Sequence, residues 1–211
     1  MFSKFKIFFT HKDKNLRDNR WIFTSMLIGA AFSLLAAFVL SVESIDIAKN
    51  PNAQLSCSIN AVINCATVAR HPSASLLGFP NSFLGLVAEP VVITVAIAGL
   101  AGVKFPRRFL FTAQIFYAAG FVFAYYLFFT SMFVIQALCP WCLLVTLSTT
   151  FVFFSMARYN IREDNLYLPR AVAAKAKAFI TRDYDKFTLA IIVVAIIAGI
   201  ILKYGSALFA Q

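Results

Sequence analysis

Long apolar runs, separated by short polar or basic segments, dominate the chain. A helix crosses the roughly 30 Å hydrocarbon core of a bilayer with about 20 mostly apolar residues, at about 1.5 Å per residue. Runs of this kind lie at about residues 21–42, 82–103 and 187–208. The pattern therefore predicts membrane-spanning helices at these three places.

A further apolar run, residues 109–157, contains no Asp, Glu, Lys or Arg. As one helix it would be roughly twice as long as the bilayer core is thick, so it must form two spans. Polar residues and a proline interrupt it between Thr130 and Pro140, and we expect the chain to reverse there. A third span then ends near Phe129 and a fourth begins near Cys139. The predicted fold class is an all-α integral membrane protein, a four-helix transmembrane bundle with a fifth transmembrane helix.

The composition excludes a single water-soluble core. Hydrophobic residues make up 61% of the chain and charged residues only 13%, against about 25% charged in soluble domains. The net charge of +10 would suggest nucleic acid in a soluble protein. Here, however, Lys and Arg concentrate in residues 1–20, 104–108 and 158–186 and are sparse in the other connections. Because cytoplasmic segments are enriched in basic residues, we expect a cytoplasmic N-terminus and no nucleic-acid partner.

This topology divides the chain into four parts. They are a cytoplasmic basic tail (1–20), a four-helix domain (21–157) whose loop 43–81 lies on the outer face, a cytoplasmic basic connection (158–186), and the fifth helix with an outer C-terminus (187–211). The first span is too long for a signal peptide, so we interpret it as an uncleaved anchor. A short helix is predicted at residues 171–179, and Lys203 is placed to snorkel toward the headgroups.

The four cysteines fall into two pairs on the expected outer face. Cys57 and Cys65 precede the second span, and Cys139 and Cys142 form a C-P-W-C motif where the fourth span begins. Disulfide chemistry is permitted outside the cytosol. Residues three apart at a helix start can approach closely enough for a disulfide, and the helix N-terminus favours thiolate. Cys57 and Cys65 are too far apart in a continuous helix, so the chain between them must bend if they pair.

Two other interpretations of the cysteines were weighed. Free cysteine is a common buried residue, and four thiolates can hold a structural zinc ion. Two pairs at one membrane interface are an improbable accident of packing, and C-P-W-C opens an apolar helix rather than a polar zinc loop. Paired redox cysteines without a metal are therefore the favoured interpretation.

These residues carry a resemblance. Cys57, Cys65, the segment L-L-G-F-P-N-S-F-L-G at 76–85 and the later C-P-W-C together resemble the vitamin K epoxide reductase family over about residues 21–157. The chain looks most like bacterial members, which reoxidise secreted-protein disulfide catalysts at the expense of a quinone. The resemblance implies four helices around a quinone of the menaquinone, ubiquinone or vitamin K type. Some members carry a thioredoxin-like domain after the fifth span; since this chain stops at Gln211, we expect that partner to be a separate exofacial protein.

The resemblance also assigns roles to the cysteines. Cys57 and Cys65 match the shuttle pair that takes electrons from the partner, and Cys139 and Cys142 match the pair that faces the quinone. By that match Cys65 exchanges with Cys139, and Cys142 donates electrons to the quinone. Where the family commonly has a serine, six residues after Cys65, this chain has His71, followed closely by Ser73 and Ser75.

A quinone site needs apolar walls and one or two hydrogen-bonding groups. Asn81 matches an asparagine that in some relatives donates to the quinone carbonyl. Glu89, the only acidic residue within a predicted span, is either a proton relay or a protonated carboxyl bonded to a neighbouring helix. Aromatic side chains are the candidates for the walls of the site. From this set we predict Tyr125 and Trp141 as quinone contacts; the full set is Phe116, Tyr117, Tyr125, Tyr126, Phe128, Phe129 and Trp141.

The expected function is that of a cell-membrane thiol oxidoreductase, which passes electrons from a thioredoxin-like dithiol to quinone and so drives disulfide formation. One alternative is reduction of a quinone epoxide with thiol electrons. A transporter of reducing equivalents needs cysteines on both faces, and none lies in a predicted cytoplasmic segment. A non-enzymatic membrane assembly protein would tolerate replacement of Cys139 and Cys142.

Overall fold

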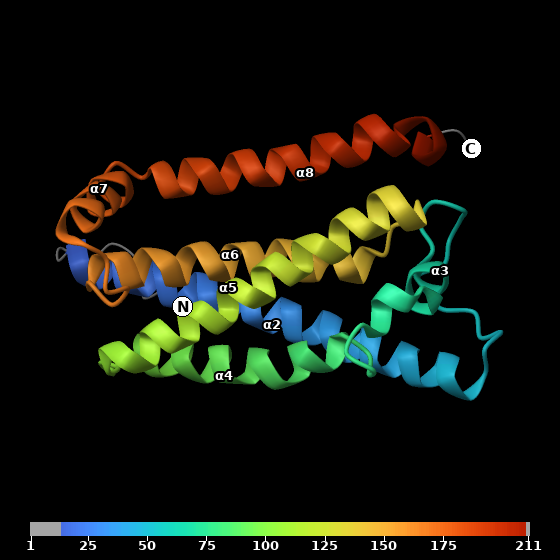
Figure 1. Ribbon diagram of the computed structural model, residues 1–211, viewed down its shortest axis with the longest axis horizontal. Helices are drawn as coiled ribbons and strands as arrows, with labels where there is room; N and C mark the ends of the chain where they lie inside the picture. Colours follow the sequence, from blue (N-terminus) through green and yellow to red (C-terminus); the bar gives the residue numbers. More distant parts are fainter. Residues whose placement is uncertain (1–13, 210–211) are drawn as a thin grey trace, which may run out of the picture.

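The computed structural model describes residues 14–209 and is built of helices (Figure 1). Five of them are long and apolar enough to cross a membrane: α2 (Lys14–Lys49), α4 (Ser82–Leu100), α5 (Arg107–Phe129), α6 (Pro140–Arg162) and α8 (Tyr184–Phe209). Within the described range there is no strand, only one isolated bridge between Ile63 and Leu138. The prediction of an all-α membrane protein is confirmed. The short helix expected at residues 171–179 is also present, as α7 (Arg170–Thr181).

The reversal lies inside the predicted window, but the third span continues further than expected. After Phe129 the chain remains helical as the π-helix η2 (Thr130–Ile135), and it turns at Gln136, whose backbone is left-handed with φ 58°. Pro140 then occupies the first turn of α6, where its missing N–H costs no helical hydrogen bond. The turn is therefore compressed into the few residues just before the C-P-W-C motif.

Helix α2 is longer than the first predicted span at both ends. It begins at Lys14 and continues past Val42 to Lys49. The sequence pattern ended the span at Val42 because charged and polar residues follow, but these residues extend the same helix beyond the apolar stretch. Glu43 is consequently held on a rigid helix rather than in a loop.

The core forms where α2 packs between α4 and α6 (Figure 1). Its centre contains Met26 and Ala30 from α2, Ala96 from α4 and Val152 from α6, each almost completely buried. Small residues permit the close approach of α2 and α4, as is common in membrane bundles. A β-carbon added at Gly85 of α4 would lie 2.7 Å from the β-carbon of Ala37.

Substituting Gly85 by alanine should destabilise the bundle. The added methyl group overpacks the α2–α4 contact, which typically costs about 1–3 kcal/mol. The matched control is Gly120→Ala on α5, where a β-carbon meets no atom within 4 Å and alanine gains up to about 1 kcal/mol of helix propensity. Thermal unfolding of the detergent-solubilised protein should shift down for Gly85→Ala and not for Gly120→Ala. Equal shifts would contradict this packing.

Helix α8, the fifth transmembrane helix, contacts the rest of the bundle near both of its ends. Near one end, the Lys203 ammonium and the Tyr204 hydroxyl both donate to the carbonyl oxygen of Met132 in η2, at 2.6 and 2.7 Å. Lys203 thus makes a contact between helices, and its reach toward the headgroups stays a prediction. At the end of the bundle opposite α3 (Cys65–Arg70), Arg158 of α6 forms ion pairs with Asp18 of α2 and Asp185 of α8 (Figure 1).

Candidate active site

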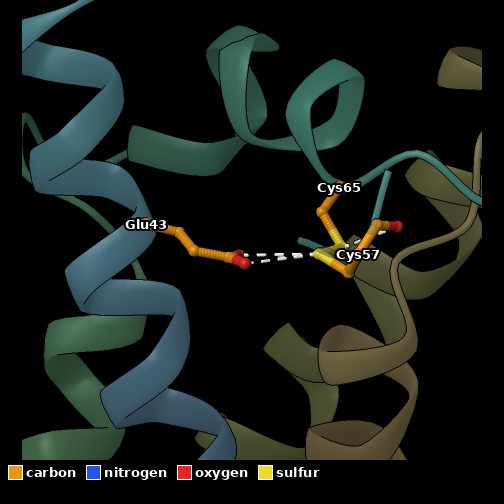
Figure 2. A group of neighbouring side chains, drawn as sticks. All are labelled: Glu43, Cys57 and Cys65. Atoms are coloured by element: carbon orange, nitrogen blue, oxygen red, sulfur yellow. Dashed lines mark hydrogen bonds between the residues drawn. A yellow bond between two sulfur atoms is a disulfide. The ribbon is translucent and has the colours of Figure 1, made fainter. Parts of the chain in front are cut away.

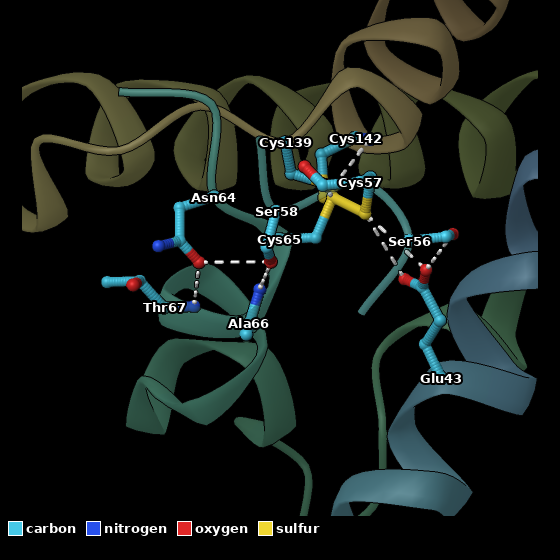
Figure 3. Close-up of a disulfide and its surroundings, with 10 residues drawn as sticks. All are labelled: Glu43, Ser56, Cys57, Ser58, Asn64, Cys65, Ala66, Thr67, Cys139 and Cys142. Carbon is cyan, nitrogen blue, oxygen red and sulfur yellow. Dashed lines mark hydrogen bonds between the residues drawn. A yellow bond between two sulfur atoms is a disulfide. The ribbon is translucent and has the colours of Figure 1, made fainter. Parts of the chain in front are cut away.

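The four cysteines converge in one buried cluster (Figure 3). Cys57 and Cys65 form a disulfide with their α-carbons 5.6 Å apart, whereas Cys139 and Cys142 are free thiols. Within the cluster Cys65 and Cys139 are almost completely buried, and Cys57 is 8% exposed. The structure therefore brings the two pairs together, with one pair oxidised and the other reduced.

The loop that closes the disulfide is shaped by asparagine side chains. The Asn60 carboxamide oxygen accepts hydrogen bonds from the backbone N–H groups of Val62 and Ile63, which turns the chain back. Asn64 then caps α3, because its side-chain oxygen accepts from the Thr67 N–H at 3.0 Å. Cys65 consequently begins α3 beside Cys57, and this is the bend that the eight-residue spacing required.

A short backbone ladder fixes the loop against the second pair. The Asn64 N–H donates to the Leu138 carbonyl at 3.0 Å, and the Leu138 N–H donates to the Val62 carbonyl at 2.7 Å. Leu138 directly precedes Cys139 in the chain. The ladder thus holds the loop that carries the disulfide beside the start of the C-P-W-C motif.

Cys139 is placed to be a thiolate. Its sulfur caps α6 and accepts a hydrogen bond from the Cys142 N–H at 3.4 Å. The Cys142 thiol, together with the backbone N–H groups of Cys142 and Trp141, lowers the pKa of Cys139, although burial acts in the opposite direction. A lowered pKa increases the thiolate fraction at neutral pH, and thiolate is the form that attacks disulfides.

The Cys142 thiol should control how readily Cys139 ionises. In Cys142→Ala the hydrogen bond to the Cys139 thiolate is lost, so the pKa of Cys139 should rise and its alkylation at pH 7 should slow. Cys142→Ser keeps a donor and should retain most of the lowering. The measurement is the pH dependence of Cys139 alkylation by iodoacetamide in both variants. Identical profiles would show that the Cys142 side chain does not set this pKa.

A large cavity extends from the cysteines into the bundle. Its volume is about 1160 Å³, and Cys65, Cys139 and Cys142 all contribute to its lining. Most of the remaining lining is apolar and comes from α2, α4, α5 and α6. Two buried polar atoms in the described range have no hydrogen-bond partner, Asn81 Oδ1 and Glu89 Oε2, and both residues line this cavity. An apolar chamber with unpaired polar atoms fits a flat, apolar ring that carries carbonyl or hydroxyl groups.

Asn81 belongs to a small network at the entrance to α4. Its side-chain N–H donates to the Ser73 carbonyl at 2.6 Å, while its carboxamide oxygen is unpaired. His71, which stands where the family commonly has a serine, accepts from the Ser73 N–H and lies 2.8 Å from the Ser73 hydroxyl. His71 thereby organises the turn that orients Asn81, and Ser73 lines the cavity.

Glu89 lies deep in the bundle and bonds to two neighbouring helices. Its Oε1 accepts from the Ser33 hydroxyl of α2 at 2.9 Å and from the Tyr117 hydroxyl of α5 at 3.3 Å. All three residues line the cavity. Glu89 therefore has the interhelical hydrogen bonds expected of a structural carboxyl and also the contact with the cavity expected of a proton relay, so both interpretations of Glu89 stay open.

Four of the seven aromatic candidates do not line the cavity: Tyr125, Tyr126, Phe129 and Trp141. The Tyr125 hydroxyl lies 2.9 Å from the Thr150 hydroxyl, and its ring packs on the cluster beneath α8. From the predicted aromatic set, Phe116, Tyr117 and Phe128 do line the cavity. Trp141 packs against the cysteine cluster instead, and a quinone contact of Tyr125 or Trp141 stays a prediction.

Glu43 is the residue of this site that sequence reasoning missed. Its carboxyl is buried beside the disulfide, with Oε1 3.4 Å from the Cys57 sulfur (Figure 2). Glu43, Cys57 and Cys65 lie close enough to hold a metal ion, but sulfurs joined in a disulfide are not thiolate ligands. The signal in the sequence is an acidic residue directly after an apolar run, at the point where the pattern predicts that the first span ends.

Comparison with known protein families matches residues 24–157 to the vitamin K epoxide reductase family. No curated protein matches the chain significantly. The matched segment contains both cysteine pairs, helices α4 and α5, and most of α2 and α6, so it includes nearly all of the cavity lining. It covers well over half of the chain. The protein is therefore a membrane oxidoreductase that belongs to the vitamin K epoxide reductase family.

Proposed function

We propose that the protein reoxidises a thioredoxin-like dithiol protein and passes the electrons through its two cysteine pairs to a membrane quinone. The observation that carries the proposal is the single cluster in which a disulfide lies beside two free thiols at the edge of an apolar cavity. One pair is ready to accept electrons and the other is ready to release them.

Electrons enter at the disulfide. A partner thiolate attacks Cys57, the more exposed sulfur, and the Cys57–Cys65 bond breaks with Cys65 leaving as thiolate. The second partner thiol resolves the mixed disulfide and leaves oxidised. The Cys57–Cys65 pair has then gained two electrons, and the partner has lost two.

Transfer between the pairs takes place when the second pair is oxidised. The Cys65 thiolate attacks Cys139 of a Cys139–Cys142 disulfide, and Cys142 leaves as thiolate. Cys57 then attacks Cys65, reforms the first disulfide and releases Cys139 as the thiolate that its lowered pKa favours. The result is the arrangement observed, with a Cys57–Cys65 disulfide and two free thiols.

The cavity is the proposed quinone site. A quinone supplies a two-electron, two-proton acceptor, which the Cys139 and Cys142 dithiol can reduce as it becomes a disulfide. Cys142 lines the cavity and is the proposed electron donor. Asn81 would orient a carbonyl or hydroxyl group, and Glu89 would deliver protons through its contacts with Ser33 and Tyr117.

The basic segments support an orientation with the N-terminus in the cytoplasm and the cysteines on the outer face of the cell membrane. In that orientation the disulfide meets secreted proteins, where oxidation is permitted. The product of the cycle would be disulfides in proteins outside the cytosol.

The test is turnover of the purified full chain in detergent with a reduced thioredoxin-like protein and ubiquinone-1 or menadione. We expect loss of quinone absorbance together with oxidation of the donor. A parallel assay offers the epoxide of the quinone in place of the quinone itself. Faster consumption of the epoxide would favour the alternative function, and consumption of neither compound would reject both.

A further inference from the structure

Glu43 is held against the sulfur that first meets the partner. It projects from α2 toward the disulfide, and its side chain is only 7% exposed (Figure 2). Its two carboxyl oxygens lie 3.4 and 3.7 Å from the Cys57 sulfur, and the Ser56 hydroxyl lies 3.5 Å from Oε1. The helix continues for more than a turn beyond Glu43, which fixes the carboxyl in place.

The contact has a different meaning in the two redox states of Cys57. A disulfide sulfur carries no proton, so the contact is a hydrogen bond in the oxidised state only if the carboxyl donates. When Cys57 is a thiol, it donates and the carboxylate accepts. One geometry therefore accommodates a proton on either atom, which is what transfer between the two atoms requires.

We propose that Glu43 is the catalytic acid and base of Cys57, an inference that rests on the function proposed above. When the partner's second thiolate attacks the mixed disulfide, the bond between the partner sulfur and Cys57 breaks. Cys57 leaves with the electron pair and takes the proton of the Glu43 carboxyl. In the later step the Glu43 carboxylate takes that proton back, and the Cys57 thiolate attacks Cys65 of the disulfide with Cys139. The proton cycles between the two residues, and each disulfide broken is matched by one formed.

Other titratable groups surround this carboxyl. Asp46 lies on the same helix and is exposed, and Cys139 and Cys142 interact electrostatically with Glu43 from α6. Cys57, however, makes the direct contact with the carboxyl (Figure 3). Asp46→Asn is therefore a matched control, because it removes a carboxylate one turn along the same helix without touching the sulfur contact.

The experiment measures how fast 2-mercaptoethanol reduces the Cys57–Cys65 disulfide in the full detergent-solubilised chain, with released thiols counted by alkylation and mass spectrometry. With a monothiol, Cys57 must be expelled whichever sulfur is attacked first. We expect Glu43→Gln to be about 10²-fold slower than wild type at pH 7, at the lower end of general acid–base effects. Glu43→Asp should recover part of the rate, and Asp46→Asn, which changes only an electrostatic neighbour of Glu43, should stay within a few-fold of wild type.

The pH dependence separates proton transfer from a structural role. Toward pH 9, above the ordinary pKa of a cysteine thiol, the departing Cys57 thiolate needs no proton from Glu43, so the ratio of the wild-type rate to the Glu43→Gln rate should fall toward one. A ratio that stays constant with pH, or equal rates at pH 7, would overturn the inference. This experiment contains no quinone and no partner protein, so its outcome tests only the role of Glu43. If the wild-type chain fails to reduce quinone in the separate turnover assay, that result rejects the proposed function and not the role of Glu43.

Discussion

Replacing Cys142 by serine is expected to abolish quinone reduction, with a loss of about 10³-fold or more. Serine cannot form a disulfide, so the second pair can no longer surrender two electrons. The Cys57–Cys65 disulfide lies on separate segments and should still form. The measurement is the rate of quinone absorbance loss with dithiothreitol as donor, together with a count of free thiols.

A buried residue on the same helix provides the control for this substitution. Ser148 is buried on α6 but is not among the residues lining the cavity, and Ser148→Ala should leave the rate within a few-fold of wild type. If Cys142→Ser also retained the wild-type rate, the cysteines would be inert. The interpretation as a non-enzymatic assembly protein would then be favoured.

Replacing Cys65 by serine is expected to separate the two halves of the relay. Electrons from a thioredoxin-like donor should no longer reach the cavity, a loss of about 10²-fold or more, because the proposed relay passes them from Cys65 to Cys139, which lies in the same buried cluster. Dithiothreitol is much smaller than a protein donor, so we expect it to reduce the Cys139 and Cys142 pair without Cys65 and still to support quinone reduction. Paired steady-state assays with the two donors measure this difference.

A companion variant sharpens that result. Cys57→Ser should show the same selective loss with the protein donor, since it removes the other half of the shuttle disulfide. Unchanged turnover of Cys65→Ser with the protein donor would mean that electrons enter directly at Cys139 or Cys142, and the relay between pairs would be wrong.

The spans of the fold were predictable because the thickness of a bilayer sets their length. Run length placed five helices, and the lack of charge in residues 109–157 required a reversal there. The same criterion gives the wrong end for α2. The apolar stretch shows where the chain leaves the lipid, but the helix continues beyond that point to Lys49. The apolar pattern therefore places Glu43 in a loop, although it lies on α2.

The site was predictable only in part. Cys139 and Cys142 are only three residues apart, so their proximity can be predicted from the sequence, and the family resemblance indicated the pair Cys57 and Cys65. The contact between the two pairs depends on the ladder between Asn64 and Leu138, which joins segments far apart in the chain. With 24 Phe and many apolar helical faces, composition could not tell that Tyr125 and Trp141 lie outside the cavity lining while Phe116 lies within it.

The most direct measurement is a single turnover of the fully reduced chain, mixed without oxygen with a stoichiometric amount of quinone, while quinol and free thiols are counted in the same samples. The relay requires two thiols to disappear for each quinol formed. It also requires the disulfide to appear first at Cys139 and Cys142 and then to pass to Cys57 and Cys65, which leaves Cys139 and Cys142 as free thiols again. Quinone that stays unreduced while all four thiols remain free would contradict a thiol-to-quinone relay.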